Sequence, residues 1–338
     1  MKKLLTIVVP IYKVEKYINK CLDSLVVQEN LMEVLEVICV NDGTPDNSAV
    51  MAKEYEKKYP DTFKVIDKEN GGHGSAWNKG LELATGKYLR FLDSDDWLTN
   101  LPDFLGRLAT VDVDMIFTDL QIVYEDSSIQ GKLYTCNNAL DVDKVYNTDK
   151  YDWRKSRSMY DGHNFTNFHM CTYRTSILKK FCPIFLEKIF YDDEILMVLP
   201  LCVSKTFVYF DLVLYNYLKG REGQTVDINV RLKSLGFDVK EKKQMIEFYN
   251  SHPIPNTNLD KELRFIIGRK VKFTLKTITL LPPQKGIACL KEFISWLKQN
   301  YYIFFKGEYG FVYKMPMTLF YYIYHTKWLL LNLRSINK

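Results

Sequence analysis

Short apolar runs alternate with stretches of helical spacing over the first hundred residues, and this alternation restricts the fold more than any other feature. The four apolar runs, each with the length and composition of a buried strand, are residues 4–9, 36–40, 63–66 and 88–92. Between the first two, Ile18, Cys21, Leu22 and Leu25 recur at helical spacing. Strands that alternate with helices predict βαβ units and a mostly parallel sheet.

Helix start and stop signals support this alternation. Asn47 or Ser48 can cap a helix that runs to residue 59, and Ser75 can cap a helix that Gly86 ends. Farther along, the expected elements are strands at 115–123 and 132–138, loops over 149–172, helices at 176–180 and 195–203, and a pair of strands at 206–210 and 212–218. From residue 228 the spacing is helical, and prolines at 253, 255, 282 and 283 mark the breaks.

Polar or glycine-bearing clusters lie at or after the ends of all four early strands. These clusters are residues 10–12 (PIY), 41–43 (NDG), 71–72 (GG) and 93–95 (DSD). Ligands of open parallel sheets bind outside the carboxyl ends of the strands. We therefore expect these clusters to lie together and to form a site of the nucleotide-binding type.

The last cluster, Asp93-Ser94-Asp95, comes directly after a strand and is followed by Asp96 and Trp97. Short polar side chains of this kind suit a tight turn. Mg²⁺ and Mn²⁺ prefer oxygen ligands, often one or two carboxylates together with substrate phosphates. Taken alone, the cluster could be an acidic turn on a solvated surface, but its neighbours favour a site for Mn²⁺ or Mg²⁺ made by Asp93 and Asp95.

The composition is that of an ordinary globular protein. The chain has 338 residues, a length sufficient for one large domain or two smaller ones. Of these residues 47% are hydrophobic, and the formal net charge is +5. Its seven cysteines are scattered and form no Cys-x-x-Cys pair, as expected for reduced thiols in a cytosolic protein. The apolar run at residues 4–9 is too short for a signal peptide, so we expect a cytoplasmic protein.

Read together, the motifs between residues 4 and 220 resemble those of the family 2 glycosyltransferases, which have a GT-A fold. The matching segments are 8–12 (VVPIY), 40–48 (VNDGTPDNS), 70–72 (NGG), 78–81 (NKGL), 86–88 (GKY), 91–98 (FLDSDDWL) and 191–193 (YDD). The resemblance implies an α/β fold, with a Rossmann-like, mostly parallel sheet and helices on both faces. It implies a GT-A domain at residues 1–220 and a helical C-terminal region at residues 221–338.

The resemblance also implies which residues bind the donor. Pro10 and Tyr12 would line the base pocket, and Asp42 would accept a hydrogen bond from the uracil ring. Asp93 would contact the ribose, and Asp95 would hold the metal that bridges the two phosphates. The other donor-binding residues that it implies are Gly71, Gly72, Asn78 and Ser94.

Asp193 matches the general base of the family, which would take the proton of the acceptor hydroxyl. Asp192 stands where the family more often has Glu. Acids that stabilise a helix N-terminus are the alternative interpretation of this pair. His73, Trp97 and Arg221 are further candidates for acceptor or loop contacts. His73 could instead be structural, and the segment of Arg221 could close over pyrophosphate or be an exposed linker.

Three positions depart from the family pattern. Lys13 replaces an Asn, Asn41 an Asp, and Trp77 an Arg. These departures leave open a non-catalytic protein that binds nucleotide sugars. His163 and His169, in the presumed acceptor region, are interpreted as structural residues.

Residues 301–338 are rich in aromatic side chains and carry five cations against the single anion Glu308. No run there reaches the ~18 apolar residues that a membrane-spanning helix needs. Such a segment fits an interfacial helix on an anionic membrane surface, a helical subdomain packed against the transferase domain, or a membrane or partner scaffold. Basic residues do not cluster elsewhere, so no nucleic-acid partner is expected.

We therefore predict a metal-dependent, inverting glycosyltransferase. It would move a hexose from a nucleotide-diphosphate donor, UDP-linked by resemblance, to a hydroxyl of a glycan or lipid-linked acceptor. The habits of the family suggest capsule or other cell-surface polysaccharide synthesis at the cytosolic face of the membrane.

Overall fold

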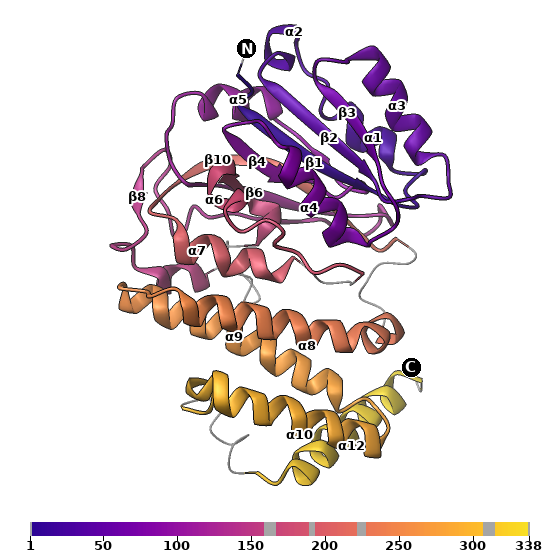
Figure 1. The fold of residues 1–338 in the computed structure, drawn as a ribbon, viewed down its shortest axis with the longest axis vertical. Coiled ribbons are helices and arrows are strands. Elements are labelled where there is room, and N and C mark those ends of the chain that lie inside the picture. Colours follow the sequence, from indigo (N-terminus) through magenta and orange to yellow (C-terminus); the bar gives the residue numbers. More distant parts are fainter. Residues whose placement is uncertain (1, 159–166, 189–192, 222–227, 307–314, 337–338) are drawn as a thin grey trace. The chain divides into compact units, whose positions relative to one another are not determined.

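The computed structural model describes residues 2–158, 167–188, 193–221, 228–306 and 315–336. The chain divides into two compact units, residues 1–224 with 254–259 and residues 225–253 with 260–338. The first unit contains the sheet, and the second is built from helices (Figure 1). A domain boundary between residues 220 and 221 stays a prediction.

Within the described residues, ten strands form one sheet. The strands are β1 (Leu5–Ile11), β2 (Leu35–Asn41), β3 (Phe63–Asp67), β4 (Tyr88–Phe91), β5 (Trp97–Leu98), β6 (Met115–Tyr124), β7 (Lys132–Tyr134), β8 (Tyr146–Asn147), β9 (Cys171–Arg174) and β10 (Thr206–Lys219). The main path across the sheet is β3-β2-β1-β4-β9-β6-β10-β5. Strands β1 and β4 are buried along their whole length, and β2 is buried up to its last residue, because they lie inside this path, where both faces can be covered.

The sheet changes its winding direction between β1 and β4. From β1, the strands β2 and β3 are added in turn toward one edge of the sheet, whereas β4 pairs with the other side of β1. All of these pairings are parallel. Strand β9 is antiparallel to both β4 and β6, so β6 and its parallel partner β10 run in the same direction as β1. The carboxyl ends of β1, β2, β4, β6 and β10 therefore point to one edge, and the switch point beside β1 lies there.

Helices connect the strands of the first unit. They are α1 (Ile18–Asp23), α2 (Glu29–Met32), α3 (Ser48–Lys58), α4 (His73–Leu83), α5 (Leu101–Leu108), α6 (Thr175–Lys179) and α7 (Leu199–Val203). Helix α4 packs on β1 and β2, whereas α3 packs on β3 and α1. Right-handed crossovers on either side of the switch point place α3 and α4 on opposite faces of the sheet. The predicted α/β class with a mostly parallel sheet is confirmed.

Several local predictions are wrong. Helix α4 begins at His73 after Gly72, whose φ of +88° suits glycine, and Ser75 is a buried residue inside the helix instead of its cap. The predicted pair of strands is the single strand β10, because a bulge between Tyr209 and Val213 lets the pairing with β6 continue.

The region expected to be loops, residues 149–172, leads into the strand β9, and its described residues include the short 3₁₀ helices η1 (Trp153–Ser158) and η3 (Phe168–Met170). The expected helix at 195–203 is divided into η4 (Glu194–Met197) and α7, with Pro200 in the first turn of α7. Strand β7 is shorter than expected.

The second unit is helical, as predicted. Its described elements are α8 (Ile228–Ser251), α9 (Thr257–Ile278, of which residues 257–259 belong to the first unit), α10 (Pro283–Asn300), η5 (Tyr302–Phe305) and α12 (Met317–Ile336). The prolines at 253, 255 and 282 lie between helices and Pro283 begins α10, as the sequence indicates. In α12 the Tyr321 hydroxyl donates a hydrogen bond to the Leu281 carbonyl at 2.5 Å. Among the described residues, no helix has the length and apolar character needed to span a membrane.

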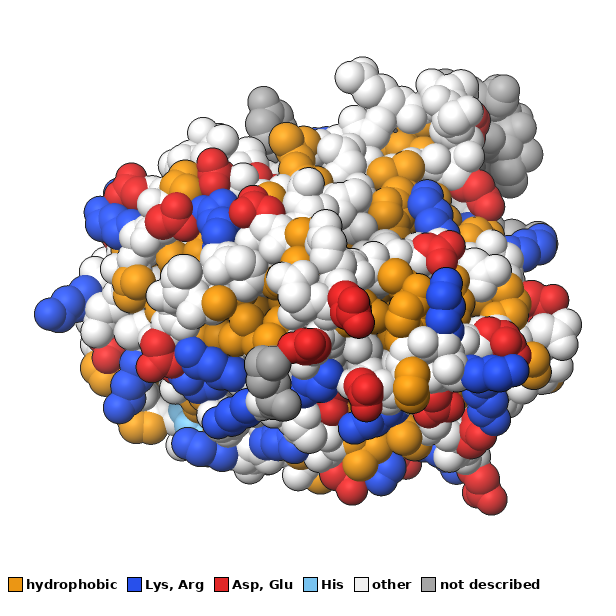
Figure 2. Space-filling view, turned by 90° about the horizontal axis from the view of Figure 1, so that it is seen from above, with side chains coloured by type: hydrophobic (Ala, Val, Ile, Leu, Met, Phe, Trp, Pro, Cys, Tyr) orange, Lys and Arg blue, Asp and Glu red, His pale blue; other side chains and the backbone are white. Residues whose placement is uncertain are grey.

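The face of the molecule drawn in Figure 2 mixes both kinds of charge. Lysine, arginine, aspartate and glutamate side chains lie interspersed there, with apolar patches between them. Exposed apolar side chains among the described residues include Tyr12 after β1 and Leu319, Tyr322 and Ile323 on α12.

Candidate active site

Asp42 follows β2 and organises the loop before α4. It is 3% exposed, and its carboxylate accepts hydrogen bonds from the backbone N–H groups of Gly71 at 2.9 Å and Gly72 at 2.8 Å. Lys68 Nζ lies 2.7 Å from the same carboxylate. The sequence places Asp42, Gly71 and Gly72 in one site, and the structure brings them together. Both carboxylate oxygens already have partners, so contact with a base would use remaining lone pairs.

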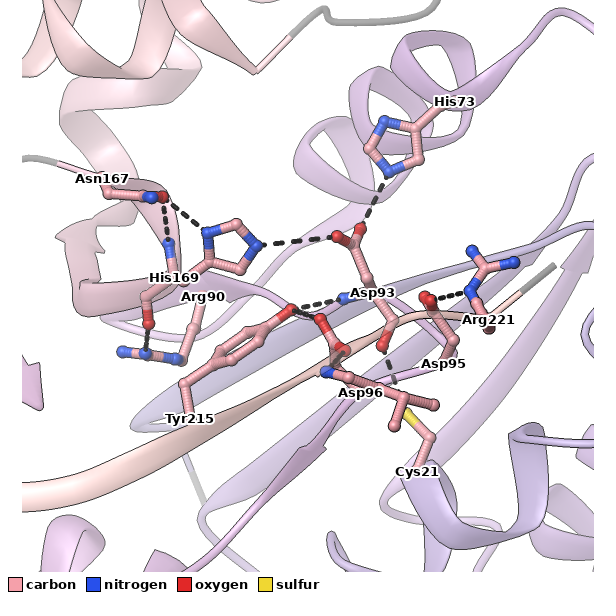
Figure 3. A network of polar contacts seen from close by, with 11 residues as sticks. Cys21, His73, Arg90, Asp93, Asp95, Asp96, Asn167, His169, Tyr215 and Arg221 are labelled. Carbon is pink, nitrogen blue, oxygen red and sulfur yellow. Dashed lines mark hydrogen bonds and ion pairs between the residues drawn. The ribbon is translucent and has the colours of Figure 1, made fainter. Parts of the chain in front are cut away.

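The same loop connects Asp42 to the acids after β4. His73, the first residue of α4, directs Nε2 to Asp93 Oδ1 at 3.0 Å (Figure 3). Burial opposes ionisation of Asp93, but the hydrogen bond and positive charge of His73 lower the pKa of Asp93 below its ordinary value. The Gly71-Gly72-His73 turn thus holds the ends of β2 and β4 in fixed relation.

Asp95 is only 9% exposed and is paired with Arg221, which follows the carboxyl end of β10. Burial and the neighbouring charge of Asp93 raise the pKa of Asp95, and Arg221 opposes this shift. Residues 126 positions apart in the chain therefore meet at one edge of the sheet. The sequence names both residues as candidates but does not predict this pair.

Asp96 anchors β10 beneath the other acids. Its carboxylate accepts hydrogen bonds from the Tyr215 hydroxyl at 2.7 Å and from the backbone N–H of Leu218 at 2.8 Å. Burial and the charges of Asp95 and Asp93 raise the pKa of Asp96 well above its ordinary value. Asp93 is held from the same side, since its backbone N–H donates to the Tyr215 hydroxyl at 3.2 Å.

Asp193 directly precedes η4 and is partly exposed. Burial raises the pKa of the Tyr217 hydroxyl, and the negative charges of Asp96, Asp93, Asp95 and Asp193 raise it further. Asp193 and the acids that follow β4 therefore act electrostatically on the same hydroxyl. Asp192 lies outside the described residues.

His169 is a second, buried histidine that faces Asp93, from another direction than His73 (Figure 3). Its Nε2 lies 4.0 Å from Asp93 Oδ2, and Asn167 Oδ1 lies 2.6 Å from its Nδ1. Burial lowers the pKa of His169 to about 4. The carbonyl of His169 accepts a hydrogen bond from Arg90, a fully buried side chain whose pKa burial lowers to about 10.

The remaining predicted donor residues lie at different depths. Pro10 is the buried penultimate residue of β1, whereas Tyr12 just beyond it is 44% exposed. Ser94 is buried between the two acids. Asn78 Nδ2 donates to the Phe185 carbonyl at 2.7 Å, and its Oδ1 accepts from Ile184 N and Phe185 N. These bonds give Asn78 a structural role, and its contact with a donor stays a prediction.

Two tryptophans near the site differ in environment. Trp77, which replaces the family arginine, is fully buried and stacks on Phe91 with ring centroids 4.4 Å apart. It therefore fills the core beneath the site. Trp97 begins β5, and Lys20 Nζ lies 3.1 Å above its ring. Contact between Trp97 and an acceptor stays a prediction.

The sequence profile described as "Glycosyl transferase family 2" matches residues 6–182, which is more than half of the chain. The chain belongs to glycosyl transferase family 2. The resemblance drawn from its motifs is thereby confirmed. Asp42, the glycines at 71 and 72 and the acidic residues at 93–96 all lie inside the matched segment.

Individual relatives are similar over shorter stretches. A putative glycosyltransferase of Bacillus subtilis, EpsH, is 39% identical over 125 residues, which cover 36% of this chain and 35% of EpsH. The poly(ribitol-phosphate) beta-glucosyltransferase of Bacillus spizizenii is 41% identical over 96 residues, covering 28% of this chain and 15% of that protein. The matched part thus spans about a third or less of the length of these curated relatives.

The crystal structure of Staphylococcus aureus TarS, residues 1–349 in complex with UDP-GlcNAc, has the same fold. The superposition has a TM-score of 0.64 at 20% sequence identity and covers 86% of this chain and 80% of that one. This likeness confirms the predicted GT-A type of fold.

The acids after β4 offer a suitable donor set for the divalent cation that the family resemblance implies. Oxygen ligands suit Mg²⁺ and Mn²⁺, and the pKa values of Asp95 and Asp96 are raised partly by the repulsion of neighbouring carboxylates. A bound cation would relieve this repulsion. Asp93 and Asp95 are the residues that would hold it.

Sequence reasoning missed the supporting residues of the site, which include Lys68, Arg90, Asp96 as an anchor, His169 and Tyr215. Nothing in the sequence marks residues 171–174 as a strand, so the sequence gives no sign that His169 lies beside Asp93. Since β9 is antiparallel, its start lies at the edge where the parallel strands end, and this direction brings His169 to Asp93.

Proposed function

We propose that this protein is a metal-dependent glycosyltransferase that moves a hexose from a nucleotide-diphosphate donor to an acceptor hydroxyl. One observation carries the proposal. The negative charges of Asp193 and of the candidate metal-binding acids, Asp93 and Asp95, all raise the pKa of the Tyr217 hydroxyl, and this shared effect supports one site for a base and a cation. Family membership supplies the reaction class.

The reaction we infer is a single displacement. The carboxylate of Asp193 takes the proton of the acceptor hydroxyl as its oxygen forms a bond to the anomeric carbon. The bond from that carbon to the diphosphate oxygen breaks on the opposite face, which inverts the anomeric configuration. A cation held by Asp93 and Asp95 would neutralise charge on the departing diphosphate.

UDP-sugars are the first donors to test. A protein of the same fold was crystallised with UDP-GlcNAc, and the motif resemblance also points to UDP. The acceptor we propose is a hydroxyl of a cell-surface polymer or of its lipid-linked precursor. Relatives named for minor teichoic acid biosynthesis and for poly(ribitol-phosphate) glucosylation support this class.

The test is a panel of nucleotide sugars incubated with the purified full chain, Mn²⁺ and candidate acceptors. We expect release of nucleoside diphosphate from one donor, loss of turnover in EDTA, and loss of turnover in Asp95→Asn. The configuration of the product, read by the anomeric proton coupling in NMR, should be inverted. Tight binding of UDP with no turnover of any donor would favour a non-catalytic nucleotide-sugar-binding protein instead.

A peripheral membrane contact is supported by one surface of the second unit. Leu319, Tyr322 and Ile323 are about half exposed on α12, at spacings that place them on one helix face, and Lys327 is exposed farther along. Apolar side chains next to cations suit an anionic interface. The full chain should pellet with anionic vesicles but not with neutral phosphatidylcholine vesicles, and Leu319→Glu with Ile323→Glu should abolish this binding. Equal binding by the double variant would contradict a contact through α12.

A further inference from the structure

Two histidines flank the carboxylate of Asp93, and their geometries differ. His73 Nε2 lies 3.0 Å from Oδ1, which is the distance of a hydrogen bond. His169 Nε2 lies 4.0 Å from the other oxygen, Oδ2, which is too far for a hydrogen bond. Figure 3 shows both rings pointing toward Asp93 from different elements, α4 and the η3 turn before β9. His73 therefore hydrogen-bonds the Asp93 carboxylate, whereas Nε2 of His169 faces the carboxylate across a wider space.

The tautomer of His169 follows from its contact with Asn167. Asn167 Oδ1 accepts the backbone N–H of His169 at 3.2 Å, which identifies that atom as the oxygen of the amide. The same oxygen lies 2.6 Å from His169 Nδ1, so Nδ1 carries the proton. In the neutral ring the lone pair then lies on Nε2, which faces Asp93.

The ring is fixed in this direction by its surroundings. His169 is 8% exposed, and its ring centroid lies 4.9 Å from that of Tyr215 and 4.8 Å from that of Tyr217. The buried guanidinium of Arg90 holds its carbonyl. Metal-binding histidines typically donate their second ring N–H to such a fixed acceptor, which orients the ligating nitrogen.

The atoms that face one another at this point are all electron-rich. His169 Nε2 and carboxylate oxygens of Asp93 and Asp96 lie within 4.8 Å of one another. Asp96 is already engaged by Tyr215 and Leu218, so we do not assign it as a ligand. Two ligands on a metal with bonds of about 2.1 Å are separated by roughly 3 to 4 Å. The gap between His169 and Asp93 has this size.

We propose that His169 Nε2 is a nitrogen ligand of the divalent cation and shares it with Asp93. This inference rests on the proposed metal-dependent function and adds a ligand to it. A nitrogen ligand favours Mn²⁺ over Mg²⁺, because imidazole suits transition metals and Mg²⁺ prefers oxygen. His73 has a different task, since its bond to Asp93 Oδ1 positions the shared carboxylate.

Electron spin echo envelope modulation of Mn²⁺ bound to the full chain with UDP tests this assignment directly. We expect a ¹⁴N coupling from the histidine nitrogen, replaced by the ¹⁵N pattern when the protein is labelled with ¹⁵N-histidine. His169→Gln should lose the coupling and weaken Mn²⁺ binding at least about tenfold. The matched variant His73→Gln should keep it. Asn167→Ala retains the ring and tests the orientation, with a loss of affinity of about tenfold or more.

Two results would overturn the inference and leave the proposed function standing. One is Mn²⁺ bound without any nitrogen coupling in the wild type. The other is coupling that persists in His169→Gln and disappears in His73→Gln. If the wild type binds no Mn²⁺ with UDP present, the inference falls too. Donor turnover in EDTA then decides separately whether the transferase proposal survives without a metal.

Discussion

The guanidinium of Arg221 is paired with the carboxylate of Asp95, the residue that the family resemblance assigns to the metal. A cation that binds Asp95 must therefore displace Arg221 or share the carboxylate with it. Displacement would free a guanidinium beside the site, where it can bind a diphosphate. Binding of a cation at Asp95 would thus change the contacts of Arg221.

Replacing Arg221 should change the binding of the free metal. We expect Arg221→Gln to bind Mn²⁺ about fivefold more tightly in the absence of nucleotide, because removal of a competing ion pair is worth about 1 kcal/mol. Isothermal titration of Mn²⁺ into nucleotide-free protein measures this change. Arg221→Lys, which keeps the charge, is the control and should stay near the wild type. Weaker binding by Arg221→Gln would contradict the competition.

The loop held by Asp42 should be sensitive at Gly72. Its φ of +88° is unfavourable for any residue with a Cβ, and its N–H donates to Asp42. Gly72→Ala should lower the free energy of unfolding by about 1–2 kcal/mol and weaken UDP binding. Urea unfolding and titration of UDP measure the two effects.

Gly106 provides the matched control. It lies in α5, and an added Cβ would meet no atom within 4 Å. Gly106→Ala should leave UDP binding unchanged and should stabilise the fold by up to about 1 kcal/mol. Equal losses of UDP affinity in the two variants would show that the Gly72 loop has no special role.

Glu36 in β2 should make the fold sensitive to acid. It is 1% exposed and accepts hydrogen bonds from Thr6 Oγ1 at 2.6 Å and Thr85 N at 2.7 Å. Burial opposes ionisation, but these bonds lower the pKa of Glu36 below its ordinary value. The pKa of Glu36 is lower in the folded than in the unfolded state, so its carboxylate stabilises the fold at pH values above the pKa of the unfolded state. This stabilisation is lost as the pH falls through the pKa of the folded state.

Glu36→Gln should therefore flatten the loss of stability below about pH 4.5. At pH 7 it should cost about 1–3 kcal/mol, since it leaves buried partners poorly satisfied. Unfolding curves recorded from pH 7 to acid measure both effects. Glu29→Gln, at an exposed position of α2, should change neither. If the stability of Glu36→Gln falls at acid pH as steeply as that of the wild type, this carboxylate does not cause the acid sensitivity.

Asp193 should affect the chemical step alone. Asp193→Asn removes the proposed proton acceptor, so kcat should fall by roughly 10² to 10⁴, while KM for the donor and the affinity for Mn²⁺ should stay within about twofold. Steady-state kinetics and Mn²⁺ titration separate these quantities. Asp61→Asn, at an exposed position before β3, is the control. A variant that retains more than half of the wild-type kcat would exclude Asp193 as the base.

The strand ends were predictable because each strand has a local signal. An apolar run followed at once by Asp93 or Asn41-Asp42 needs no tertiary information to be placed at a carboxyl edge. Parallel pairing then brings these ends together, and the family motifs name the residues. For this reason Asp42, Gly71, Gly72, Asp93 and Asp95 were foreseen as neighbours.

The partners of these residues could not be foreseen, because they depend on long-range geometry. Arg221 reaches Asp95 only because β10 is one bulged strand, where the sequence suggests two. His169 reaches Asp93 only because β9 is antiparallel and inserted between β4 and β6. Four residues, Cys171–Arg174, are too short to show the period of a strand.

The acids after β4 should make nucleotide binding depend on a divalent cation. The most direct measurement is titration of UDP into the full chain with Mn²⁺ and again with EDTA, for the wild type and Asp95→Asn. We predict that the wild type binds UDP at least about tenfold more tightly with Mn²⁺, and that Asp95→Asn loses most of this difference. UDP binding that is the same with Mn²⁺, with EDTA and in the variant would exclude a cation held by these acids.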